Sequence, residues 1–262
     1  MASKNFYQFQ MRLSNSIATK LILSLITFVF TSGLFAQTPY SKTIYCAFIV
    51  RDMAKWESVI HTMEASNSTN TVDEKLELIN YYYGYIGYLL GSKQYAHVEK
   101  LTERGEKLIA QVLHASPHNA TAYSFKGSFI AFHVGLNKYK AVFMGAESRN
   151  CVNKALELDP QNIQGLIDKG NQLFYAPAIL GGDKKEALAY FQKAASILER
   201  KKETTENWVY LNVLTMIASA YENMDNLKDA KATYEKVIHL EPNISWVKND
   251  LYPNLLAKIN GK

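Results

Sequence analysis

Small residues and prolines recur along this chain at one fixed interval. Gly84, Gly127 and Gly170 are each separated by 43 residues, and Pro117 and Pro160 are the same distance apart. Aligned on its prolines, the chain gives three similar segments, 105–117, 148–160 and 230–242, each starting with a small residue and ending with proline. Residues 187–199 form a fourth copy that lacks the proline. Repetition at this period predicts one supersecondary unit stacked several times.

The clearest copy of the unit lies between Ala218 and Pro242. Its apolar residues follow helical spacing on two short segments, and proline ends the second one. We expect small residues to mark the places where two helices cross. These repeat positions are Gly84, Gly127, Gly170, Ala218, Ala155, Ala187 and Ala230, with Pro117, Pro160 and Pro242 closing the second helices.

This order of small, aromatic, aliphatic and proline positions resembles the tetratricopeptide (TPR) repeat over about residues 72–259. The resemblance implies an α-solenoid of helix-turn-helix units and a binding activity, without saying what is bound. No segment shows the alternation and turn chemistry of a strand, so we expect an all-α fold. The first three units are longer than the 34-residue pattern typical of the family.

The pattern predicts the following organisation. A helix over 42–65 lies within an N-terminal capping region, 37–71, and a capping box at Thr71 and Glu74 starts the first repeat. The repeats cover about 72–117, 118–160, 161–203 and 204–242, and a C-terminal helix over 244–259 lies within a cap at 243–262. The helix that follows the capping box is expected to end at 90, and the next is expected to run from after Ser92 to about 115. The later helices are expected over 119–136, about 141–158, 162–175, 184–200, 207–223 and 227–240.

The third repeat contains the unusual loop "APAILGGD" at 176–183. Pro177 ends the preceding helix, Gly181 and Gly182 can take positive φ, and Asp183 caps the next helix. Residues 165–195 resemble the corresponding part of the T component of some TRAP transporters. That resemblance implies a periplasmic accessory to solute uptake.

The first 36 residues read as an export leader. They combine a basic start, the apolar run 21–30 and a small-residue site after Ala36. The alternative is an uncleaved anchor, although the 16 residues from Leu21 to Ala36 are fewer than the ~20 that span a bilayer. Met1 and Met11 are both candidate starts. The ending "FAQ" resembles leaders of exported Bacteroidetes proteins, which implies the periplasm, with secretion as a second destination.

The whole chain carries a net charge of +5, from 29 basic and 24 acidic residues. Removal of the leader, with its three basic residues, leaves 26 basic against 24 acidic residues, or +2. That balance and the interleaving of charges along the helices do not indicate nucleic-acid binding. Cys46 and Cys151 can pair in an oxidising compartment, but we expect them to be buried apolar residues.

The first helix of each TPR unit lines the concave face, so residues around its small position define a predicted groove. The predicted lining is aromatic at the N-terminal end and polar at the C-terminal end: Tyr81, Tyr85, Tyr88, Ser124, Ser128, Ala131, Ile167, Asn171, Phe174, Thr215, Ser219 and Glu222. Tyrosines offer large contact area at low entropic cost, which suits a peptide or a sugar. The alternative interpretation is that "YYYGYIGY" packs against the N-terminal cap.

Sequence motifs for catalysis or metal binding are not found. His114 and His118 have i,i+4 spacing, but Pro117 interrupts the helix between them, so we expect no metal site. Gly181 and Gly182 before a helix start could hold an anion, and Lys138, Tyr139 and Lys140 could form a basic lip. We interpret the first as a helix cap and the second as a solvated turn. The groove lacks the Lys and Arg that chaperone-binding TPRs use to clamp a carboxylate.

The sequence therefore predicts a non-catalytic, cofactor-free scaffold in the cell envelope that binds a protein or peptide in its groove. The alternative is a periplasmic small-solute-binding accessory of a transport system, and an enzyme comes third. Partner identity, pathway and oligomeric state stay open.

We expect the exported protein to begin near Gln37. N-terminal sequencing of the protein purified from its own host measures this directly. A start at Met1 or Met11 on protein recovered with membranes would show that the leader is an uncleaved anchor.

Overall fold

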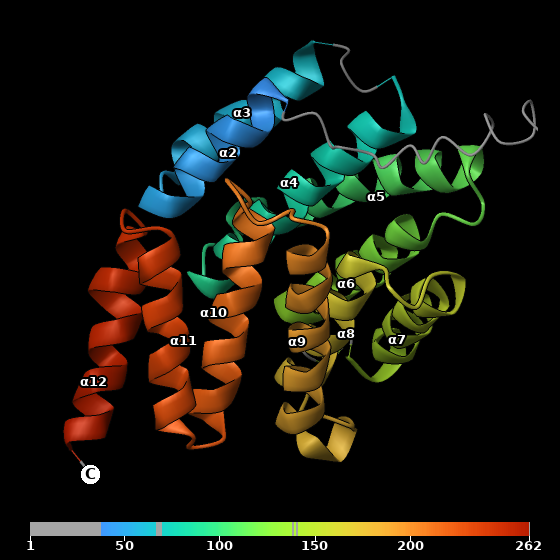
Figure 1. Cartoon of the computed structure of the whole chain (residues 1–262). Helices are drawn as coiled ribbons and strands as arrows, with labels where there is room; N and C mark the ends of the chain where they lie inside the picture. The colour runs from blue at the N-terminus through green and yellow to red at the C-terminus, as the bar shows by residue number, and fades with distance from the viewer. Residues whose placement is uncertain (1–37, 67–69, 138, 140, 262) are drawn as a thin grey trace, which may run out of the picture. The chain divides into compact units, whose positions relative to one another are not determined.

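The computed structural model describes residues 38–66, 70–137, 139 and 141–261. Residues 39–262 form one compact unit, and the leader lies outside the described residues. Figure 1 shows helices joined by short turns, and the described residues contain no strand. The α-helices are α2 (Pro39–Val50), α3 (Met53–Ala65), α4 (Val72–Gly91), α5 (Val98–Ala115), α6 (Ala120–Leu136), α7 (Ala141–Leu158), α8 (Ile163–Tyr175), α9 (Lys184–Arg200), α10 (Trp208–Asn223), α11 (Leu227–Leu240) and α12 (Tyr252–Asn260).

The all-α architecture predicted from the repeats is confirmed. Successive helices pack as the pairs α4–α5, α6–α7, α8–α9 and α10–α11, and α7, α9 and α11 have the predicted bounds. Side-chain caps explain where most helices begin, because an oxygen at the N-cap accepts a free backbone N–H. Thr71 and Glu74 form the expected capping box. The second helices α5, α7 and α11 end two residues before Pro117, Pro160 and Pro242.

The single helix expected over 42–65 is wrong. The chain breaks between α2 and α3 at Arg51, which has a φ of 58°. Asp52 then caps α3 by accepting the N–H of Lys55 at 2.9 Å. A positive φ takes the chain out of the right-handed helix, so α2 and α3 become a helical hairpin.

Two other helices depart from the predicted bounds. The helix expected directly after Ser92 begins only at Val98, because Lys93 has a φ of 60° and a 3-10 turn, η1 (Tyr95–His97), precedes α5. The C-terminal helix contains a π-turn, η4 (Val247–Leu251), followed by α12. Pro253 lacks a backbone N–H, so the regular bonding pattern is interrupted there.

Glycines lie where helices approach each other closely. A Cβ built on Gly127 would lie 2.7 Å from the carbonyl oxygen of Ser148 on α7, and one on Gly170 would lie 2.5 Å from the ring of Phe191 on α9. A Cβ built on Gly84 would lie 2.6 Å from the ring of Trp56 on α3, so the neighbour of α4 at this point is the N-terminal hairpin. The alanines at the other repeat positions are fully buried: Ala155, Ala187, Ala218 and Ala230.

The N-terminal hairpin also contacts the last helices. Trp56 and Trp208 pack edge to face with ring centroids 5.0 Å apart, and Phe48 packs on Trp246 at 5.4 Å. Trp246 donates its indole N–H to the carbonyl oxygen of Phe48 at 3.1 Å, and Arg51 pairs with Asp250 at 3.1 Å. The hairpin therefore joins the first and last parts of the compact unit.

The same substitution is expected to have opposite effects at two glycines. Gly170→Ala should lower the free energy of unfolding by about 1–3 kcal/mol, because the new methyl group collides with the fully buried ring of Phe191. Gly87→Ala should raise it by about 0.5–1 kcal/mol, because Gly87 is exposed within α4 and a Cβ there meets nothing within 4 Å. Urea unfolding measures both, and equal effects would contradict the crossing at Gly170.

Candidate functional site

The predicted groove residues fall into two groups in the structure. Tyr88, Ala131, Asn171, Ser219 and Glu222 are partly exposed, whereas Tyr81, Tyr85, Ser124, Ser128, Ile167, Phe174 and Thr215 are buried. The buried serines Ser124 and Ser128 lie on α6 and Asn171 lies on α8, the first helices of two successive pairs. The exposed group is concentrated toward the later helices.

A buried carboxylate joins α6 and α8 at the centre of this face. Asp168 is only 1% exposed. Its Oδ2 accepts the hydroxyl of Ser124 at 2.6 Å, and both its oxygens accept the side-chain amide of Gln164, at 3.1 and 3.0 Å. Buried charge is costly unless it is hydrogen-bonded, so these donors are needed for the helices to pack here.

Burial has the largest effect on the pKa of the Asp168 carboxyl group. It raises the pKa of Asp168 to about 6, although hydrogen bonds from Ser124, Gln164, Ser128 and Tyr83 favour the charged form. The pKa of Tyr83 is also raised, mainly by burial and then by the neighbouring Asp168 charge. The cluster is a satisfied polar network that holds helices together, and its protonation changes near neutral pH.

Tyr83 extends the network to a third helix. Asn171 on α8 donates its side-chain amide to the Tyr83 hydroxyl at 2.8 Å, and the Tyr83 ring packs against Phe125 and Phe132 on α6. Tyr83, Asp168 and Gln164 were not among the residues predicted from the sequence. The available signal was a lone acid inside the otherwise apolar "GLID" face, with glutamine one helical turn before it.

The N-terminal tyrosines pack as the alternative interpretation expects. Trp56 on α3 donates its indole N–H to the carbonyl oxygen of Tyr81 at 3.0 Å, and the two rings meet edge to face. Burial and a hydrogen bond to Glu57 raise the pKa of Tyr85 to about 12. The hairpin α2–α3 therefore covers this end of the face.

The accessible part of the face lies on α8 and α10. Tyr175, the last residue of α8, is 70% exposed, and its hydroxyl lies 3.9 Å from the sulfur of Met216 on α10. One helical turn further along α10 are Ser219 and then Glu222, which pairs with Lys258 of α12 at 3.5 Å. Tyr175 and Met216 were also missed, because the register placed the groove one position away from each.

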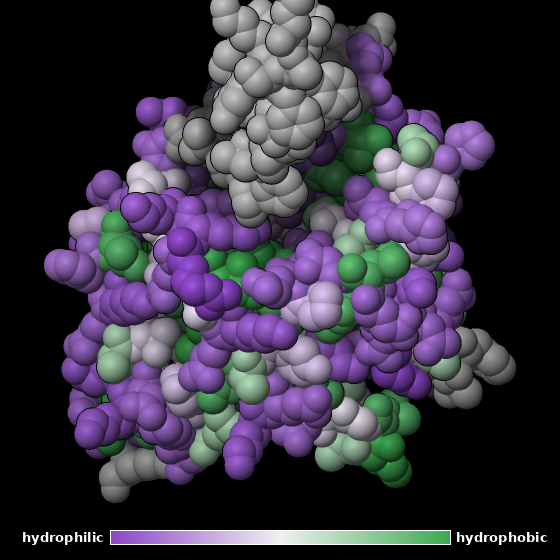
Figure 2. All heavy atoms as spheres, turned by 45° about the vertical axis from the view of Figure 1, so that its right-hand side comes forward, coloured by the Kyte–Doolittle hydropathy of each residue, from purple (hydrophilic) through white to green (hydrophobic). Residues whose placement is uncertain are grey.

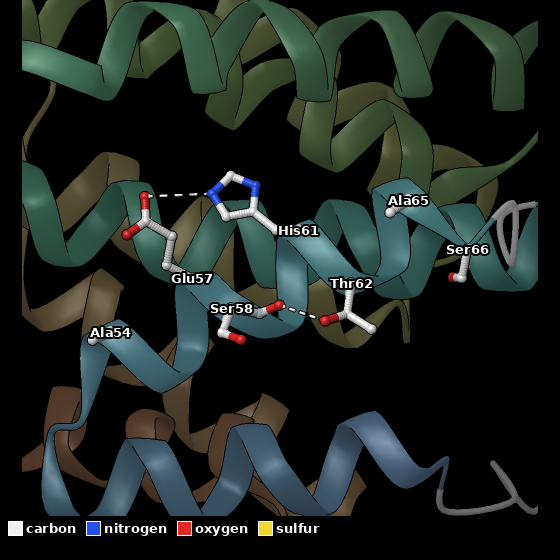
Figure 3. A pocket seen from close by; sticks show the side chains of 7 residues that line it. All are labelled: Ala54, Glu57, Ser58, His61, Thr62, Ala65 and Ser66. Carbon is white, nitrogen blue, oxygen red and sulfur yellow. Dashed lines mark hydrogen bonds and ion pairs between the residues drawn. The ribbon is translucent and has the colours of Figure 1, made fainter.

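A surface depression lies on the outside of the hairpin. Figure 3 shows its described lining, which comes from α3 and its C-cap alone: Ala54, Glu57, Ser58, His61, Thr62, Ala65 and Ser66. The His61 ring lies 3.9 Å from the carboxylate of Glu57 and 3.1 Å from that of Glu64, all three at least partly exposed on neighbouring turns of α3. Because all of these residues lie along one helix, their side chains do not surround a ligand from several sides. This depression therefore carries no proposal of a ligand site.

Other sequence expectations are located as follows. Gly181 has a φ of 89°, and Asp183 accepts the N–H groups of Lys185 and Glu186, so a carboxylate already occupies the start of α9.

The two cysteines differ in exposure. Cys151 is buried as expected, but Cys46 is exposed, and both are free thiols. Lys138 and Lys140 of the basic lip lie outside the described residues. Within the described ranges, no group of three or more His, Cys, Asp or Glu could hold a metal ion, and no helix is long and apolar enough to cross a membrane.

Comparison with known proteins identifies the repeat. The family described as "Tetratricopeptide repeat" matches residues 211–244, which include most of α10 and all of α11. A thermophilic TPR protein of Thermus thermophilus has a similar structure, with a TM-score of 0.54 and 13% identity, covering 83% of this chain and 99% of that one. The HusA haemophore of Porphyromonas gingivalis is also similar, with a TM-score of 0.55 and 15% identity, covering 72% and 96%. No curated protein matches the sequence significantly.

Asp168 should make stability depend on pH. Its pKa is higher in the folded state, about 6, than the ordinary value of 3.8. Its contribution is therefore greatest below pH 4 and is lost as the pH rises through 6. We expect the free energy of unfolding, relative to Asp168→Asn, to fall by about 2–3 kcal/mol between pH 4 and pH 7.

Denaturant unfolding of both proteins at several pH values measures this difference. Asp73→Asn, at an exposed position in the first turn of α4, is the control and should track the parent protein. A difference that does not change with pH would show that Asp168 is not a buried ionisable group.

Proposed function

We propose that this tetratricopeptide-repeat protein is a non-catalytic scaffold that binds a protein or peptide partner on the face formed by its first helices. TPR folds serve in general as protein-interaction scaffolds, and this chain has that fold. The observation that carries the proposal is the row of partly exposed side chains on α8 and α10. We place the scaffold in the cell envelope, on the strength of the predicted leader.

The partner is expected on the C-terminal half of this face. The hairpin α2–α3 already covers Tyr81 and Tyr85, so the aromatic end is occupied by the chain itself. Tyr175 and Met216 provide an exposed aromatic and a flexible thioether, a combination that adapts to varied apolar side chains. Asn171 and Ser219 lie on the same two helices and can hydrogen-bond to an extended backbone.

The charged residues of the proposed face restrict the kind of partner that it can bind. The predicted groove positions include no Lys or Arg, so a terminal carboxylate would find no cationic clamp there. The carboxylate of Glu222 at the far end is paired with Lys258. We therefore expect recognition by aromatic contact and neutral hydrogen bonds, which depends little on salt.

Small-solute binding is the alternative use of the same face. The structurally similar HusA is described as a haemophore, but at 15% identity the similarity shows only a common fold. Absorbance titration with haem tests this alternative. Saturable binding that is abolished by Tyr175→Ala would favour it over a peptide partner.

Two exposed tyrosines provide a matched test of the scaffold. Tyr175 lies on the proposed binding face, whereas Tyr95 lies in the turn before α5. A photo-crosslinking residue placed at Ser219, on the α10 part of the proposed face, first identifies the partner in the native host. Tyr175→Ala should then weaken the purified complex about tenfold or more, as aromatic anchors do, and Tyr95→Ala should leave it unchanged.

Calorimetric titration measures both affinities, and thermal unfolding checks that the variants stay folded. Because both tyrosines are exposed, neither variant should lower stability much. Equal loss of affinity in the two variants, or none in either, would refute the proposed binding face.

A further inference from the structure

The turns that follow α4, α6 and α8 leave from one edge of the helix stack. At the starts of α6 and α8, Asn162 donates its side-chain amide to the Thr121 hydroxyl at 2.9 Å, and further along Ser124 bonds to Asp168. At the far ends of α4 and α6, a Cβ built on Gly135 would lie 3.4 Å from Leu90. These contacts make the three helices parallel and in register. Their C-terminal turns therefore share an edge.

Exposed hydrophobic side chains concentrate on this edge. Among the described residues, the turn before α5 exposes Tyr95, the turn before α7 exposes Tyr139, and the turn before α9 exposes Ile179 and Leu180. Ile179 is 92% exposed and Leu180 is 55% exposed. In the face drawn in Figure 2, most hydrophobic groups lie between hydrophilic ones.

The turn that carries Ile179 and Leu180 is well ordered by its backbone. The N–H groups of Leu180 and Gly182 bond to the carbonyl oxygen of Pro177 at 2.9 and 3.0 Å. Gly181 takes a left-handed φ of 89°, and a Cβ on Gly182 would collide with the carbonyl oxygen of Ala176. The two glycines thus fix a 3-10 turn, η3 (Ala178–Leu180), that holds both aliphatic side chains in solvent.

Cations flank these apolar tips. Lys93 is exposed in the turn before α5, and this turn, from Ser92 to His97, contains no acid. Lys185 is exposed at the start of α9. The acids there are Asp183, whose carboxylate accepts two backbone N–H groups, and Glu186. Glu99, in the first turn of α5, is also exposed, so the edge carries charges of both signs, with Lys93 and Lys185 beside the apolar tips.

We propose that this edge docks on the surface of an anionic lipid bilayer, with Ile179 and Leu180 inserted below the headgroups. Aliphatic tips in the acyl boundary, tyrosines at headgroup level and lysines near anionic phosphates form the pattern that interfacial binding requires. A protein partner would instead need a continuous apolar patch or a recess. The tips here are separated along the edge, and a planar fluid surface can contact all of them together. The side chains proposed to insert, Ile179 and Leu180, are not among the residues of the binding face on α8 and α10.

Vesicle binding tests the proposal with residues 37–262, since every residue of the described hydrophobic core lies within this compact unit. The probes are vesicles of phosphatidylcholine alone and of phosphatidylcholine mixed with about one third phosphatidylglycerol, whose negative surface potential attracts lysine side chains. We expect the protein to sediment with the anionic vesicles. Binding should be weaker in 0.5 M salt, because the Debye screening length there is only about 4–5 Å. Ile179→Ser with Leu180→Ser should lower the partition coefficient at least about tenfold.

Leu240→Ser is the matched control. Leu240 is 46% exposed at the end of α11, in no turn of the proposed edge, so its replacement should leave vesicle binding unchanged. Lys93→Glu with Lys185→Glu should reduce binding to anionic vesicles selectively. The proposal is overturned if the parent protein binds neither vesicle, if the serine pair at 179 and 180 binds as the parent does, or if Leu240→Ser is equally impaired. Circular dichroism and thermal unfolding confirm that each variant is folded.

Discussion

The aromatic cluster of Phe48, Trp56, Trp208 and Trp246 is the contact on which the rest of this structure depends. It contains all three tryptophans of the chain, drawn from α3, α10 and the segment before α12, and packs them at ring distances of 5.0–6.4 Å together with Phe48 of α2. In an ordinary solenoid each repeat contacts only its neighbours, so the two ends are independent. Here a helical hairpin links the first repeat to the last helices, and Figure 1 shows α2 and α3 beside both α4 and the C-terminal helices. Large buried rings contribute much of the energy of such a contact, and the Trp246–Phe48 hydrogen bond fixes its geometry.

That closure decides which part of the inner face is available. The tyrosines at its N-terminal end lie beneath the hairpin, and Asp168, Ser124, Gln164 and Tyr83 are used to bind α4, α6 and α8 together. A buried carboxylate is a costly way to join helices, but once it is fully hydrogen-bonded it specifies one register, since any slip would leave its partners unsatisfied. What remains accessible is the α8–α10 part, with Tyr175 and Met216. The proposed binding function therefore belongs to the later repeats, which are also where the tetratricopeptide family matches the sequence.

The unusual loop between α8 and α9 illustrates a different use of residues. Its length and its two glycines are not needed to connect two antiparallel helices, because the Asn223–Leu227 connection does so with few residues. Instead the loop carries two aliphatic side chains out of the core and keeps them exposed. A protein gains no folding energy from such residues. Their placement beside lysines and tyrosines on one edge is what points to a surface function separate from the inner face.

The sequence by itself determined the helix pairs, most of their ends and the all-α class, because these depend on local periodicity, capping residues and proline, which act over a few residues. It also located small residues such as Gly127 and Gly170 at helix crossings. It did not reveal the break at Arg51 or the Asp168 network, and it left open whether Tyr81 and Tyr85 line the groove or pack against the N-terminal cap. The positive φ at Arg51 could not be predicted, because arginine is not a residue that favours this conformation. The other features depend on which residues from distant repeats meet across the inner face. Only the tertiary structure decides that, because the same tyrosine is either a ligand contact or a core residue according to whether another helix covers it.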